Sequence, residues 1–173
     1  MIPKGVKRLY SVGTELAYRI NKNFYGDSHY VWCADSFHSI TQPPTSDPAT
    51  ICSRYLEQIK GGDRHAHEIK ANIAGILRGA EAKLKQGVID DDTYTKIKNI
   101  VAVPAYSAFF PVIYIIEVSK IKSKCIEVPL EDRASNSACE YRIEDLKRGD
   151  FTIIHTKDFL SNFISASEDF VVR

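Results

Sequence analysis

Residues 111–118 constrain the fold most, because they read PVIYIIEV and are almost entirely apolar. A run of apolar residues without alternation is typical of a strand that is buried on both faces of a sheet. The whole apolar stretch, residues 109–118, is about half as long as a membrane-spanning helix requires. We therefore expect a central strand of a covered sheet and no association with a membrane.

Other segments have the composition of strands, with β-branched and aromatic residues bounded by turn residues. We expect the segment 124–128 to pair with 111–118 as a hairpin. A helix over 15–24 is predicted between the first two strands, because Thr14 is a suitable N-cap and apolar residues recur every fourth position. The predicted strands, besides 111–118, are residues 8–12, 29–34, 124–128, 140–143 and 151–155.

A helical hairpin is predicted over residues 63–101. The first helix, about 63–86, has an apolar stripe with helical spacing, and Gly87 suits the position after its end. Acidic residues at 90–92 favour the start of a second helix, whose apolar face is Tyr94, Ile97, Ile100 and Val101. A shorter helix is predicted over 49–60. The expected fold is a single α/β (α+β) domain, residues 1–173, with the hairpin inserted between strands.

Charge and cysteine content exclude several classes of protein. The net charge is +1, so the chain has no global field for wrapping a polyanion, and nucleic-acid binding would need a local basic patch such as Lys4, Lys7 and Arg8. The four cysteines show no disulfide-framework spacing. The first residues lack the apolar stretch of a signal peptide. We expect a cytoplasmic protein with reduced thiols.

Three segments carry the candidate site. Tyr10 and Ser11 lie in the first predicted strand, and Tyr30 and Trp32 lie two apart in the second, where they share one face. A loop with three prolines, residues 38–50, follows that second strand. Glu140 opens a late strand behind small residues that leave room for a ligand. A rigid carboxylate there is either an ordinary edge residue or the working group of an enzyme.

These segments resemble the ADP-ribosyltransferases, and among them the DarT-type toxins. The resemblance rests on RLYSVGTELAYRI (8–20), on HYVWCADSF and PPTSDPATI (29–51) and on SACEYRI (137–143), about a third of the chain. It implies an ADP-ribosyltransferase-like split mixed sheet and the use of NAD as a co-substrate, without a metal. It also implies a toxin or phage-defence setting, DNA or RNA as candidate acceptors, and an antitoxin protein as a candidate partner.

The resemblance assigns roles to particular residues. Glu140 is the expected catalytic carboxylate, because loss of nicotinamide builds positive charge on the ribose that a fixed carboxylate stabilises. The expected dinucleotide contacts are Tyr10, Ser11, Tyr30 and Trp32. The arginine that the family carries before its Ser-Pro element is absent, since Thr45 stands before Ser46. Arg54 or Arg64 is the expected substitute that neutralises the pyrophosphate, with Arg54 as the catalytic candidate and Arg64 as the cofactor-binding one.

Two other functions are compatible with the sequence. A metal-dependent nucleic-acid-processing enzyme would use the segment GDRHAHE (62–68) or the carboxylates Glu117 and Glu127. However, the two histidines of that segment, His65 and His67, diverge if the segment is helical. A non-catalytic interaction module would instead dock a partner on the helical hairpin, which would then expose its apolar stripe.

Overall fold

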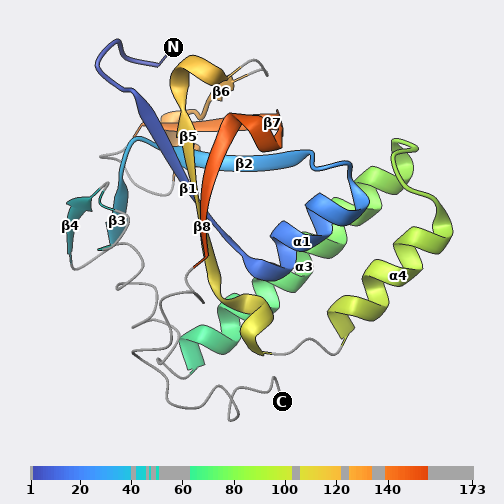
Figure 1. The fold of residues 1–173 in the computed structure, drawn as a ribbon. Helices are drawn as coiled ribbons and strands as arrows, with labels where there is room; N and C mark the ends of the chain where they lie inside the picture. Colours follow the sequence, from blue (N-terminus) through green and yellow to red (C-terminus); the bar gives the residue numbers. More distant parts are fainter. Residues whose placement is uncertain are drawn as a thin grey trace.

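The computed structural model describes residues 2–39, 42–45, 47, 50, 63–102, 106–121, 125–133 and 139–155. Strands come first and last among its described elements, and the described α-helices lie between strands along the chain (Figure 1). The strands are β1 (Arg8–Thr14), β2 (His29–Ala34), β3 (Phe37–Ser39), β4 (Gln42–Thr45), β5 (Pro111–Glu117), β6 (Cys125–Glu127), β7 (Glu140–Leu146) and β8 (Phe151–His155). The helices are α1 (Glu15–Phe24), α3 (Asp63–Lys85) and α4 (Asp91–Ala102), with short 3-10 turns η1 (Tyr106–Phe109), η2 (Val118–Lys120), η3 (Leu130–Asp132) and η4 (Arg148–Asp150).

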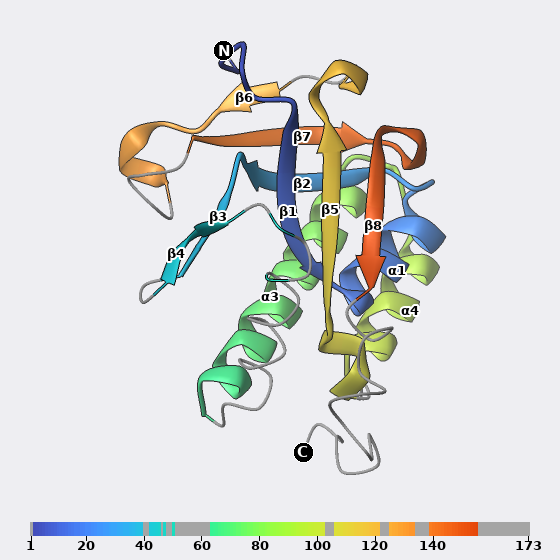
Figure 2. The same ribbon diagram turned by 60° about the vertical axis from the view of Figure 1, so that its left-hand side comes forward.

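Six strands form one sheet in the order β6-β7-β2-β1-β5-β8, and β3 pairs with β4 separately. The sheet has two halves that run crosswise to each other, β6-β7-β2 and β1-β5-β8 (Figure 2). Strands β1 and β5 pair along their whole length, from Arg8 opposite Glu117 to Thr14 opposite Pro111. In contrast, β1 and β2 pair at one position, Tyr10 opposite Ala34. The sheet is therefore split at this junction.

Two details of the predicted sheet are wrong. The pairings that the structure describes are all antiparallel, so the sheet is not mixed. The second detail is the partner of the segment 124–128, which was predicted to pair with residues 111–118. Its strand β6 instead pairs with β7, at the edge of the sheet far from β5. The reason is that β1 and β8 occupy both edges of β5, and η2 follows β5 directly. The predicted α/β class itself is confirmed.

Helix α1 begins and ends as its sequence predicts. Thr14 is the N-cap, and its Oγ1 accepts a hydrogen bond from the Ala17 amide at 3.2 Å. The same hydroxyl donates to Asn72 Oδ1 of α3 at 3.0 Å, which ties the two helices together. Helix α1 lies between the sheet and the other two helices. Tyr18 packs in the core cluster of the sheet, whereas Leu16 and Ile20 pack with α3 and α4.

The predicted helical hairpin is present as α3 and α4. Gly87 follows α3 with a φ of 74°, a left-handed conformation that glycine adopts without a steric penalty. The Asp90 carboxylate accepts a hydrogen bond from the Thr93 amide at 2.8 Å and so begins α4. Ile97 and Val101 are buried, but Ile100 is exposed, which corrects the predicted face of α4. The predicted helix 49–60 lies outside the described residues, apart from Thr50.

Candidate functional site

Strand β2 separates two environments, because successive side chains of a strand point to opposite faces. His29, Val31 and Cys33 are buried, whereas Tyr30 and Trp32 are 54% and 41% exposed. We call the buried side, against which α1 packs, the core face. The opposite side, which carries Tyr30 and Trp32, is the outer face. The two predicted aromatic residues thus share one face and are open to solvent.

Glu140 lies on the outer face, in line with Tyr10. Ala34 of β2 pairs with Tyr10 of β1 on one side and with Glu140 of β7 on the other. Residues opposite each other in antiparallel strands project to the same side, so Tyr10, Ala34 and Glu140 form a row across the junction. Two strand spacings, about 10 Å, separate the backbones of Tyr10 and Glu140.

Glu140 is held rigidly at the start of β7. Its side chain is 5% exposed, and its carbonyl accepts a hydrogen bond from the Val128 amide at 2.8 Å. The neighbouring Tyr141 and Ile143 anchor β7 in the core cluster. The strand therefore fixes the backbone that carries the carboxylate, and a group that stabilises developing charge requires such a rigid support.

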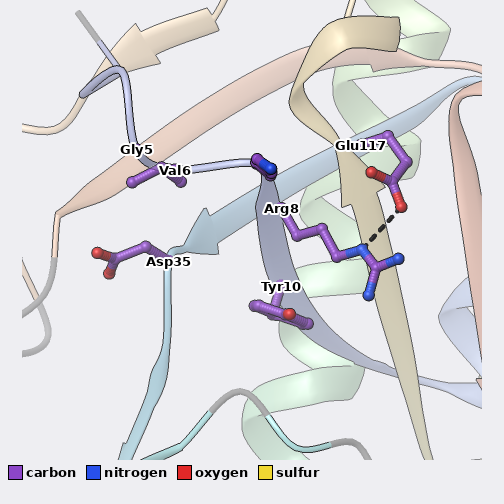
Figure 3. Close-up of a pocket in the computed structure, with 7 residues that line it drawn as sticks. Gly5, Val6, Arg8, Tyr10, Asp35 and Glu117 are labelled. Carbon is purple, nitrogen blue, oxygen red and sulfur yellow. Dashed lines mark hydrogen bonds and ion pairs between the residues drawn. The ribbon is translucent and has the colours of Figure 1, made fainter.

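A cavity of about 460 Å³ opens beside Tyr10 (Figure 3). Tyr10 and Arg8 come from β1, Glu117 comes from β5, and Asp35 follows the end of β2. Arg8 Nε donates to Glu117 Oε1 at 2.8 Å, and Figure 3 shows Asp35 across the cavity from this ion pair. The lining residues are Gly5, Val6, Lys7, Arg8, Tyr10, Asp35 and Glu117.

Asp35 lines the cavity and directly follows Ala34, the middle residue of the row. Its Oδ1 is buried and has no hydrogen-bond partner within the part of the chain that the structure describes. A buried acceptor without a donor is costly, so such a group is commonly satisfied by a ligand or a water molecule. The position of Asp35 suits an acceptor for a ligand hydroxyl or amide.

Of the three remaining predicted residues, the structure describes the side chain of one, Ser11. Ser11 lies on the core face, 5% exposed, and its hydroxyl donates to the Trp32 carbonyl at 2.8 Å. This hydrogen bond ties β1 to β2 where the two strands otherwise pair at a single position. Arg54 lies outside the described residues, and Arg64 lies in the first turn of α3 with its side chain outside them.

The predicted NAD site did not include two arginines of the outer face, although Arg8 was named in the candidate basic patch. Arg8 lines the cavity, and Arg142 lies opposite Trp32 with its guanidinium carbon 5.9 Å from the ring centroid. Each stands two residues from a predicted site residue, Tyr10 or Glu140. The period of two in a strand was the signal that could have found them.

A second polar cluster lies on the core face, around His29, which is fully buried. His29 Nε2 is 2.6 Å from Asp27 Oδ1, and Nδ1 is 3.1 Å from the Tyr114 hydroxyl. Burial lowers the pKa of His29, and Asp27 partly opposes this. Burial also raises the pKa of Tyr114. The neutral ring can donate to Asp27 while it accepts from Tyr114, so this closed cluster is structural.

Glu15 and His155 form a further buried contact beside this cluster. His155 Nδ1 lies 2.6 Å from Glu15 Oε1, and Glu15 is 1% exposed. Tyr18 fills the space between the two histidines, with ring centroids 5.6 Å from His29 and 5.3 Å from His155. These contacts hold α1 against the ends of β2 and β8.

The structure bears on the other two functions only in part, because Gly62 and the side chains of His65 and Glu68 lie outside the described residues. Among them, no group of three or more histidine, cysteine or acidic side chains is arranged to hold a metal. Glu117 and Glu127 lie on strands that are separated by β7, β2 and β1, and each pairs with an arginine. The apolar stripe of α3 packs against α1 and α4, so its described part is not an exposed docking face. None of the described helices is both long and apolar enough to span a membrane.

The chain was compared with protein-family models, curated proteins and solved structures, and none of them matches it.

Proposed function

We propose that this protein is an ADP-ribosyltransferase that uses NAD as its co-substrate, with Glu140 as the catalytic carboxylate. The observation that carries the proposal is the row Tyr10, Ala34 and Glu140 at the junction of the two half-sheets. The three segments that resemble this enzyme class contain the adjacent strands β1, β2 and β7, although the third segment is far from the first two in sequence. This adjacency supports the ADP-ribosyltransferase-like split sheet that the resemblance implies.

The reaction breaks the bond between the nicotinamide nitrogen and C1′ of the ribose. Nicotinamide leaves with the bonding electron pair, and C1′ gains oxocarbenium character. The Glu140 carboxylate stabilises this positive charge, and its burial strengthens the attraction because the surroundings are less polarisable than water. The acceptor nucleophile then bonds to C1′ and loses its proton to the carboxylate or to solvent. No metal is needed in any of these steps.

The remaining side chains of the outer face provide the binding site. The exposed rings of Tyr30 and Trp32 offer flat apolar surfaces to the nicotinamide or to the adenine. Tyr10 and Asp35 line the cavity, where the buried Asp35 Oδ1 accepts a hydrogen bond from a ribose hydroxyl or from the carboxamide. Nucleic acid, either DNA or RNA, is the acceptor class that the resemblance favours, in a toxin or phage-defence setting with an antitoxin as partner.

The test is transfer of label from ³²P-NAD by the purified protein to DNA, RNA and protein acceptors. We expect the wild type to label an acceptor, and Glu140→Gln to lower the rate by about 100- to 1000-fold, as loss of one charge-stabilising group does. The matched control is Glu144→Gln, the same change at an exposed position of the same strand. The unfolding midpoint in urea should be similar in all three proteins.

Two results would refute the proposal. One is a wild type that neither transfers label to any acceptor nor releases nicotinamide. The other is release of nicotinamide by Glu140→Gln at the wild-type rate.

A further inference from the structure

Arg142 lies two residues after Glu140 on β7, and both residues lie on the outer face. The two residues are separated by about 7 Å along β7 and project to the same side. Across the strand pair, Glu140 faces Ala34 and Arg142 faces Trp32. The guanidinium lies over the Trp32 ring at 5.9 Å, within the range of a cation–π contact. Arg142 is thus a positioned cation beside the proposed catalytic carboxylate.

Among the described residues, no carboxylate forms an ion pair with the guanidinium of Arg142. Its Nε is buried and has no hydrogen-bond partner in the described ranges. Arg8, the other arginine of the outer face, differs because Glu117 already neutralises it. A partly buried guanidinium without an acceptor is satisfied when an oxyanion enters, and its planar fork suits phosphate oxygens in a bidentate manner.

We propose that Arg142, supported by Trp32, binds the diphosphate of the dinucleotide. This inference rests on the proposed function. The nicotinamide ribose and the diphosphate are directly bonded neighbours in NAD, through the 5′ oxygen. The spacing of Glu140 and Arg142 along β7 therefore places one group at the ribose and the other at the diphosphate. Strand β7 thus supplies both the carboxylate and the arginine. An arginine on β7 would replace the one that the family carries before its Ser-Pro element, which this chain lacks.

The experiment exploits Trp32, because it is the only tryptophan of the chain. Its fluorescence, with calorimetry as a second measurement, reports the binding of NAD, ADP-ribose, inorganic pyrophosphate and nicotinamide riboside to the full chain. We expect Arg142→Gln to weaken the binding of ADP-ribose and pyrophosphate by about 10- to 100-fold, the value of a hydrogen bond to a charged group. The affinity for nicotinamide riboside, which lacks the diphosphate, should stay within about twofold.

Two variants serve as controls. Arg142→Lys keeps the charge but loses the fork, so its affinity for ADP-ribose should fall between those of the wild type and Arg142→Gln. Arg78→Gln makes the same change at an exposed position of helix α3, outside the proposed site, and its affinity for ADP-ribose should match the wild type. Urea unfolding verifies that each variant is folded.

Two outcomes would overturn the inference, and they are distinguishable. If Arg142→Gln binds ADP-ribose as tightly as the wild type while Glu140→Gln abolishes turnover of NAD, the diphosphate lies elsewhere and the proposed function stands. If the wild type neither binds nor turns over NAD, the proposed function fails and the inference fails with it. Equal losses of affinity for ADP-ribose and nicotinamide riboside in Arg142→Gln would also contradict a role at the diphosphate.

Discussion

The core face and the outer face of β2 and β7 differ in what satisfies their polar groups. On the core face, His29 is fully buried and both of its ring nitrogens have partners, Asp27 and Tyr114. On the outer face, Arg142 and Asp35 each carry a buried polar atom without a partner among the described residues. The core face also has one such atom, the Tyr141 hydroxyl, but that group is neutral, whereas the two groups near the proposed site are charged. This contrast predicts that changes on the core face alter stability and changes on the outer face alter binding.

The largest expected effect on stability is that of a substitution on the core face of β7, compared with one at the adjacent residue on the outer face. Ile143 is fully buried in the core cluster, so Ile143→Ala should lower the free energy of unfolding by about 2–5 kcal/mol. Arg142→Ala, one residue away on the outer face, should lower it by less than about 1 kcal/mol, as substitutions away from the core do. Urea unfolding of both variants measures the difference. Equal losses would mean that the outer face also serves to stabilise the fold.

A smaller effect is expected where a core-face residue ties the two half-sheets together. Ser11→Ala removes the hydrogen bond to the Trp32 carbonyl and leaves that acceptor unpaired. The free energy of unfolding should fall by about 1–3 kcal/mol. Ser11→Cys, of similar size, should restore only part of the loss because a thiol is a weaker donor. If Ser11→Ala instead abolishes NAD binding without loss of stability, Ser11 contacts the dinucleotide as the sequence predicted.

The smallest expected effect is a dependence of stability on pH. The pKa of His29 in the folded protein lies below the value of 6.5 in the unfolded chain, because burial outweighs the attraction of Asp27. The unfolded state therefore binds more protons in the interval below 6.5, and the free energy of unfolding should fall as the pH decreases through it. Above pH 6.5 this contribution should be constant. Asp27 limits the size of the effect.

Urea unfolding between pH 5 and 8 measures this contribution. His29→Gln should flatten the dependence, while His67→Gln, at an exposed position of α3, should leave it unchanged. His155 is retained in both variants, so its contact with Glu15 contributes equally. A wild type whose stability rises on acidification below 6.5 would contradict the assignment.

The sequence predicted most elements of the fold because their signals are local. The Thr14 cap, the apolar stripe of α3 and the glycine after it lie within a few residues of the structure they determine, and the structure has them as expected. The partner of β6 was mispredicted because strand pairing depends on which edges are already occupied, which is a non-local property. The burial of Ile100 was mispredicted because Ile97, Ile100 and Val101 lie within about one helical turn, and the face that packs against α3 is too narrow to bury all three.

The candidate site was predictable only in part. Local pattern identified Glu140, Tyr10 and Trp32, and the structure brings their strands side by side. The pattern did not reveal that Tyr10 and Ser11 face opposite sides of the junction, although the period of a strand requires it. Asp35 was missed because the cavity is assembled from β1, β5 and the end of β2, which no single segment of sequence contains.

The central claim is that the outer face at the junction of β1, β2 and β7 binds NAD. The most direct measurement is a set of two-dimensional NMR spectra of the backbone amides, recorded as NAD is added to the Glu140→Gln variant so that no turnover occurs. The account predicts that the shifted amides cluster at Arg8 and Tyr10, around Trp32 and Asp35, and at residues 140–142, while those of α4 stay in place. Shifts confined to the helices, or no shifts at millimolar NAD, would contradict it.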